Sequence, residues 1–139
     1  MKFFRLLFLL FLALQTQSEQ LKNILFVGNS YLYYNNSVHN YVEPMLREHH
    51  GSEIETKLSA IGGSKLHHHN IDHLLNPKNL NLDQQIDLLI MQGGSTEVVL
   101  ERDQEKFIQT VQQYSAKAQK LGVKTCLLYT SDAADDVVG

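Results

Sequence analysis

Three short runs with strand character each stop at a turn of small residues. The runs cover residues 24–27, 54–61 and 87–92, and the turns that follow cover residues 28–30, 62–64 and 93–97. The first run is apolar throughout, which is typical of a strand buried on both faces of a parallel sheet. Because parallel strands end at the same edge of their sheet, we expect the three turns to lie together at that edge.

Two segments outside these runs have helical periodicity. Apolar residues recur at helical spacing between residues 38 and 46 and again between residues 107 and 121, where Gly122 follows as a C-cap. Pro44 falls inside the first segment, so that helix either kinks there or begins near Glu43. Residues 123–125 begin a fourth strand. This alternation predicts one α/β domain, a parallel sheet with helices on both faces.

The N-terminal residues differ in character from this domain. Residues 1–18 combine a short basic start, an apolar stretch at residues 6–14 and a small-residue cleavage signal at Thr16-Gln17-Ser18. This pattern predicts a secretory signal peptide, and an uncleaved N-terminal anchor is the alternative. We therefore expect an exported protein, periplasmic or secreted, whose domain begins at residue 19 and which has no membrane span after cleavage.

The C-terminal residues 126–139 are expected to be a non-native tail. The codons of Cys126 to Asp136 can be written as a nucleotide string that resembles the transposon-end adapter of tagmentation sequencing libraries. The alternative is a genuine acidic, Ala-rich tail. If the tail is non-native, residues 19–125 are the N-terminal part of the natural domain, which continues further in the natural protein. The lone cysteine, Cys126, then has no redox or catalytic role. The formal net charge is −3 and no basic patch is present, which argues against a nucleic-acid partner.

Ser30 is the residue in these turns with the most direct chemical potential. It follows the first strand, where ligands of open α/β sheets bind, and a serine there can act as a nucleophile if a base and an oxyanion pocket converge on it. The alternative is a simple turn in which Ser30 caps a helix.

The three turns together resemble the sequence blocks of the SGNH (GDSL-type) hydrolase superfamily. Gly28-Asn29-Ser30 is similar to the first block, whose serine is the nucleophile, and Gly62-Gly63 is similar to the second. The resemblance implies a flavodoxin-like α/β/α fold, incomplete at the C-terminus. It also implies an oxyanion hole formed by the N–H groups of Ser30 and Gly63, with Gly62 as a second choice for the latter, and no cofactor.

The remaining blocks depart from the family pattern. The third is usually Gly-x-Asn-Asp, whereas this chain has Gly94-Ser95-Thr96-Glu97, so the side-chain oxyanion donor is either Thr96 or Gln92. The fourth, Asp-x-x-His, supplies the base and has no match. The resemblance therefore implies an exported esterase or acetylesterase that acts on small-molecule or glycan esters, present here as a weak or inactive fragment. The alternative is a catalytically inactive ligand-binding domain of the same fold.

A histidine-rich segment follows the second turn, with histidines at positions 67, 68, 69 and 73. His69 and His73 have the i, i+4 spacing of a metal pair on a helix, but beyond Asp72 no further ligand is evident. We expect a histidine-rich surface loop and no metal site. Glu97 and Asp83 are also expected on the surface.

Overall fold

The structure is a computed structural model that describes residues 21–50 and 53–128. The signal peptide expected at residues 1–18, and the part of the expected tail after residue 128, lie outside the described residues. Among the described residues, no helix has the length and apolar character needed to cross a membrane.

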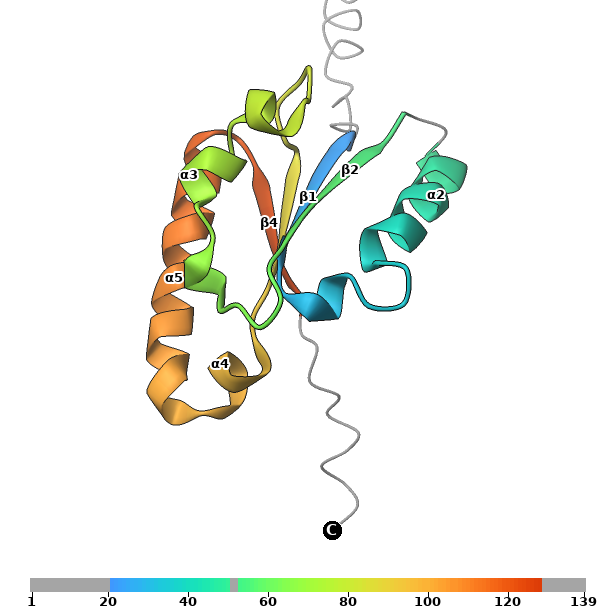
Figure 1. Ribbon diagram of the computed structural model, residues 1–139. Helices are drawn as coiled ribbons and strands as arrows, with labels where there is room; N and C mark the ends of the chain where they lie inside the picture. The colour runs from blue at the N-terminus through green and yellow to red at the C-terminus, as the bar shows by residue number, and fades with distance from the viewer. Residues whose placement is uncertain (1–20, 51–52, 129–139) are drawn as a thin grey trace, which may run out of the picture.

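The predicted parallel sheet is confirmed. Its strands are β1 (Asn23–Gly28), β2 (Glu55–Ala60), β3 (Leu88–Gln92) and β4 (Lys124–Leu128), in the spatial order β2-β1-β3-β4 (Figure 1). All three neighbouring pairs are parallel. The domain boundary expected after Thr125 therefore falls inside a strand.

The apolar run of β1 is explained by its central position. All six of its residues are buried, and its side chains alternate between two cores. Leu25 and Val27 pack on one side of the sheet, whereas Ile24 and Phe26 pack on the other. Each fully buried side chain of this kind contributes about 1.5–3 kcal/mol relative to an exposed one. A strand that serves two cores has no position left for a polar side chain in its middle.

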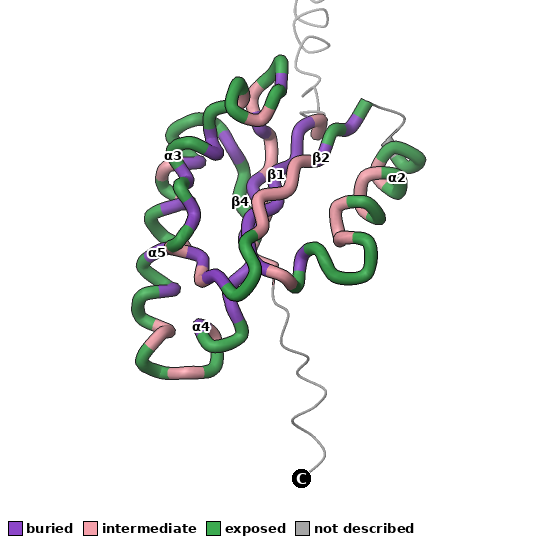
Figure 2. The backbone as a smooth tube through the Cα atoms, in the orientation of Figure 1, coloured by how far each residue is buried: buried purple, intermediate pink, exposed green. Residues whose placement is uncertain are grey.

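The two faces of the sheet are covered unequally. Helices α3 (Ile71–Leu74) and α5 (Glu101–Lys120) lie over one face, and α2 (Val38–His50) lies over the other (Figure 1). Helix α5 buries Phe107, Tyr114 and Ala118. The part of α2 whose burial is described is intermediate or exposed along its length (Figure 2). Pro44 lies inside α2, so the alternative that this helix begins near Glu43 is wrong.

Short helices follow the carboxyl ends of the first three strands. They are η1 (Ser30–Leu32) after β1, η2 (Leu66–His68) after β2, and α4 (Ser95–Val99) after β3; a further short helix, η3 (Pro77–Leu80), follows α3. Each of the first three begins within a few residues of its strand, so their N-termini gather at one edge of the sheet. That edge holds the predicted site.

Candidate active site

The first turn holds Ser30 at the start of η1. Asn29 is the N-cap: its side-chain oxygen accepts from the N–H of Tyr31 at 3.1 Å, and its side chain is buried. Ser30 is the next residue and is partly exposed. Within the described residues, neither the hydroxyl nor the N–H of Ser30 has a hydrogen-bond partner. The capping role proposed as the alternative for Ser30 belongs to Asn29, which leaves the Ser30 hydroxyl available.

The three turns meet around Asn29, as expected from the parallel topology. The Gly28 carbonyl accepts from the N–H of Ile61 at 3.2 Å, and Asn29 Nδ2 donates to the Ser64 carbonyl at 3.3 Å. The third turn closes the group: a Cβ added to Gly94 would lie 3.2 Å from the Ser64 carbonyl oxygen and 3.5 Å from Asn29 Nδ2. First, second and third turns are therefore in direct contact.

Gly63 is an exposed residue in the left-handed backbone conformation that favours glycine. Its φ is +68°, it is exposed, and nothing lies within 4 Å of the position that a Cβ would occupy. Its N–H has no partner among the described residues. The Ser64 carbonyl accepts a hydrogen bond from Asn29 Nδ2, so the N–H groups of Gly63 and Ser30 belong to adjoining turns. This arrangement suits the oxyanion role that the resemblance implies for them.

Gln92, the last residue of β3, is only 1% exposed, and both ends of its amide are engaged. Its Oε1 accepts from the N–H of Asn29 at 3.0 Å, and its Nε2 donates to the Gly93 carbonyl. Gln92 therefore supports the backbone of the first turn through its hydrogen bond with Asn29. To act as the oxyanion donor, its Nε2 would have to leave the Gly93 carbonyl.

Thr96, the other candidate donor, is exposed in the first turn of α4. Its hydroxyl contacts the carboxylate of Asp103 on α5. Lys65, at 2.7 Å, is the main reason that the pKa of Asp103 is lowered, and Thr96 adds a smaller contribution in the same direction. In this arrangement the Thr96 hydroxyl is directed toward α5.

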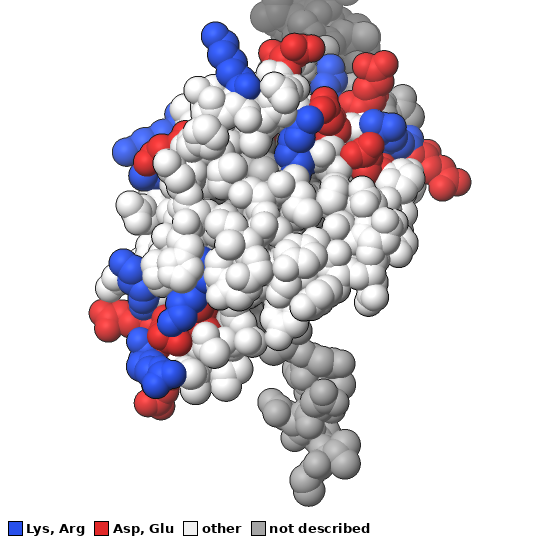
Figure 3. All heavy atoms as spheres, viewed as in Figure 1, with Lys and Arg blue, Asp and Glu red and all other residues white. Residues whose placement is uncertain are grey.

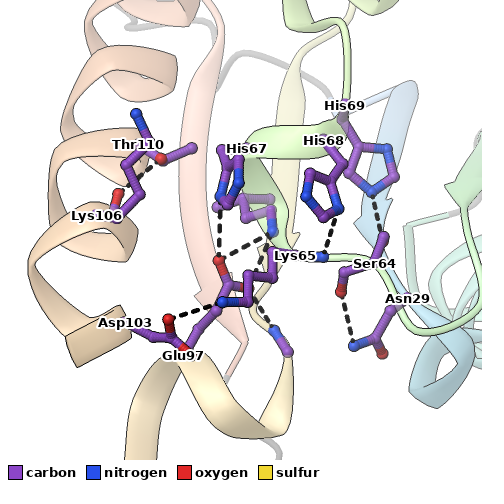
Figure 4. A network of polar contacts seen from close by, with 12 residues as sticks. Asn29, Ser64, Lys65, His67, His68, His69, Glu97, Asp103, Lys106 and Thr110 are labelled. Carbon is purple, nitrogen blue, oxygen red and sulfur yellow. Dashed lines mark hydrogen bonds and ion pairs between the residues drawn. The ribbon is translucent and has the colours of Figure 1, made fainter. Parts of the chain in front are cut away.

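Glu97 is buried, which corrects the expectation that it lies on the surface; Asp83 is exposed, as expected. Only 1% of Glu97 is accessible, and its Oε2 accepts from the N–H of Gly94 at 2.7 Å and of Leu66 at 2.9 Å (Figure 4). One carboxylate thus joins the start of α4 to the start of η2. The signal in the sequence was its position three residues after the cap Gly94, where an acidic side chain reaches back to the helix start.

His69 is also buried, so the expectation of a histidine-rich surface loop is wrong for this residue. Its Nε2 lies 3.3 Å from Ser64 Oγ and its Nδ1 lies 3.4 Å from Ser59 Oγ. Burial lowers the pKa of His69, and a hydrogen bond to the Gly28 carbonyl opposes this effect. The imidazole therefore holds the second turn against β1 and β2.

The other histidines of this segment lie toward the surface. His73 is exposed on α3, and His67 Nδ1 lies 3.8 Å from Glu97 Oε1 (Figure 4). Burial, followed by the neighbouring His68, lowers the pKa of His67. Among the side chains that the structure describes, no three of His, Cys, Asp or Glu are grouped so as to hold a metal ion. No histidine with a described side chain is hydrogen-bonded to Ser30.

The sheet order and this edge of small-residue turns give the chain an α/β fold of SGNH/GDSL-like type. Among solved structures, it is similar to a protein from Desulfitobacterium hafniense DCB-2 described as lipolytic and of the G-D-S-L family. The TM-score is 0.54 and the identity 16%, over 76% of this chain and 58% of that one. This chain thus spans little more than half of that neighbour.

A protein from Streptococcus pneumonia described as a platelet activating factor is 20% identical over 83% of this chain and 49% of that one, with a TM-score of 0.41. No family profile matches the sequence, and no curated protein matches it. The structural similarity to the Desulfitobacterium protein confirms, for the fold, the resemblance stated from the three blocks.

Proposed function

We propose that this chain is part of an exported serine hydrolase that cleaves ester bonds, with Ser30 as the nucleophile. The observation that carries the proposal is that, among the described residues, the hydroxyl and N–H of Ser30 and the N–H of Gly63 have no partner, in adjoining turns. The description of the Desulfitobacterium neighbour as lipolytic supports hydrolysis of esters. Export rests on the signal-peptide pattern of residues 1–18.

The chemistry is acyl transfer. Ser30 Oγ forms a bond to the ester carbonyl carbon while its proton passes to a base, and the carbonyl oxygen becomes an oxyanion that accepts from Ser30 N–H and Gly63 N–H. The tetrahedral intermediate then releases the alcohol, which takes up that proton, and water hydrolyses the acyl-enzyme. Each oxyanion donor contributes about 10²–10³-fold to the rate.

The mechanism also requires a general base that accepts the proton of Ser30. No histidine with a described side chain is hydrogen-bonded to Ser30, and the sequence has no Asp-x-x-His block. Loss of the base from such a catalytic group costs several orders of magnitude in rate. We therefore propose that the chain alone reacts slowly. The same observation favours the second candidate, a ligand-binding domain of this fold without catalytic activity.

Covalent labelling of Ser30 by a fluorophosphonate distinguishes the two candidates. We expect an adduct that peptide mapping places on Ser30, that is lost in Ser30→Ala, and that is retained in Ser95→Ala, an exposed serine of the third turn. Labelling of the native chain no faster than of Ser30→Ala, at every pH tested, would instead support the ligand-binding domain.

A further inference from the structure

A cluster of exposed tyrosines borders the candidate nucleophile. Tyr31, Tyr33 and Tyr34 lie within four residues after Ser30 and are 45%, 39% and 61% exposed. The rings of Tyr33 and Tyr34 are 5.5 Å apart between centroids and meet edge to face. Exposed aromatic groups gathered beside a site are unusual on a protein surface unless they contact a ligand.

The local backbone explains why these rings face outward. Leu32, in the middle of η1, is completely buried and anchors this short helix to the core on the α2 side. The three residues that follow Tyr34 all have positive φ, of 52°, 69° and 64° at Asn35, Asn36 and Ser37. Such conformations cost non-glycine residues about 1 kcal/mol or more each, and Asn tolerates them best.

Hydrogen bonds hold this loop in its strained form. Ser37 Oγ donates to the Tyr33 carbonyl at 3.4 Å, Ser37 N–H donates to the Tyr34 carbonyl at 3.2 Å, and Asn40 Nδ2 donates to the Asn36 carbonyl at 2.8 Å. The loop therefore presents Tyr33 and Tyr34 in a defined arrangement. Strain of this kind is concentrated at ligand-binding sites.

The cluster reaches the second turn. The Tyr33 hydroxyl lies 2.9 Å from the position that a Cβ on Gly62 would occupy. The aromatic surface thus begins next to the Gly62-Gly63 turn and extends outward over Tyr34. A ligand whose ester lies at Ser30 would have its remaining part within reach of these rings.

The surroundings of the cluster are uncharged. Residues 23–42, 58–64 and 88–96 contain no Asp, Glu, Lys or Arg. In Figure 3 the charged side chains gather at the top and lower left of the face shown, and the surface between them is uncharged. Lys65, which follows the second turn, is paired with Asp103 at 2.7 Å. Among the described residues, the stretches that form the three turns therefore offer no Lys or Arg for a phosphate or carboxylate.

We propose that Tyr33 and Tyr34 form a stacking subsite for a pyranose ring that carries the ester attacked by Ser30, so the substrate class is an O-acylated neutral carbohydrate. A pyranose has a face of C–H bonds that stacks on an aromatic ring, and its hydroxyls can bond to amides such as those of Asn35 and Asn36, which are exposed and directly follow Tyr34 in the chain. The reaction part rests on the proposed function; the binding part does not.

The test is affinity electrophoresis of the full chain carrying Ser30→Ala, so that no ester is consumed. Native gels contain O-acetylated xylan or O-acetylated glucomannan, and mobility gives the apparent Kd. We expect retardation that becomes about tenfold weaker in Tyr34→Ala, because one stacked ring is lost. Tyr34→Phe keeps the ring and should bind nearly normally. Tyr41→Ala removes a tyrosine of similar exposure on α2, 54% against 61% for Tyr34, and is the matched control.

Three results would overturn the subsite: no retardation by either polysaccharide, equal retardation of Tyr34→Ala and its parent, or Tyr34-dependent binding to phosphatidylcholine vesicles in place of carbohydrate. Fluorophosphonate labelling of Ser30 needs no sugar and keeps the two proposals separate. Labelling without carbohydrate binding would refute the subsite alone. Carbohydrate binding without labelling would refute the hydrolase alone.

Discussion

Glu97 offers the sharpest test of how the candidate site is held together. Its carboxylate accepts from Gly94 N–H at 2.7 Å and from Leu66 N–H at 2.9 and 3.2 Å, and both of these residues are buried. In Glu97→Ala the two N–H groups lose their partner. Each unsatisfied buried donor costs about 1–3 kcal/mol, so we expect the free energy of unfolding to fall by about 2–6 kcal/mol.

Glu97→Gln separates the hydrogen bonds from the charge. Oε2 alone accepts from both N–H groups at 2.9 Å or less, so a glutamine oxygen at that position keeps these contacts. Its Nε2 would then take the place of Oε1, 3.2 Å from Leu66 N–H, where donor faces donor. We expect a loss of about 1–2 kcal/mol, smaller than for alanine.

Urea denaturation followed by circular dichroism measures both variants. The control is Glu101→Ala, which removes an exposed carboxylate in the first turn of α5 and should change stability by less than about 0.5 kcal/mol. If the midpoint of Glu97→Ala matches that of Glu101→Ala with an unchanged m-value, Glu97 does not join the second and third turns.

Three further outcomes can be measured on the same chain. Burial lowers the pKa of His69, so His69 of the unfolded state binds a proton first as the pH falls. The contribution of His69 to the free energy of unfolding should be complete above about pH 6.5 and decrease below it by up to about 1.4 kcal/mol per pH unit. In His69→Gln the urea midpoint should depend less on pH. Gly28→Ala should destabilise by about 1–3 kcal/mol in thermal unfolding, because its Cβ would lie 2.6 Å from Gln92 Oε1; an unchanged melting temperature would contradict that packing. Added imidazole should accelerate fluorophosphonate labelling of Ser30 by replacing the absent base, and an equal acceleration in Ser30→Ala would show that the label is elsewhere.

The sheet and the meeting of its three turns could be predicted because they follow from local patterns. The continuous apolar run of β1 requires two covered faces, and parallel strands bring their carboxyl ends together whatever the side chains in between. The choice of Ser30 needed only its position after β1.

The burial of Glu97 and His69 could not be predicted in this way. Each is buried because its polar atoms find partners on other elements once the chain has folded. For Glu97 the partner is Leu66 N–H, 31 residues away, and for His69 the partners are the hydroxyls of Ser64 and Ser59. A charged residue in a turn is normally solvated, so the expectation that it lies on the surface fails when backbone donors from distant segments converge on it. The orientation of Thr96 depends in the same way on Lys65 and Asp103, which meet only after α5 packs.

The contact between Gly28 and Gln92 links two positions that are 64 residues apart. Any side chain at position 28 would enter the space that Gln92 and Leu32 already fill, at 2.6–2.9 Å from their atoms. Among proteins with this turn, a larger residue at position 28 should therefore be accompanied by a smaller one at position 92, and the two positions should covary. In a mutant library, a substitution at position 28 or 92 should be tolerated only together with a matching substitution at the other position. The two positions next to the Ser30 turn should therefore show epistasis.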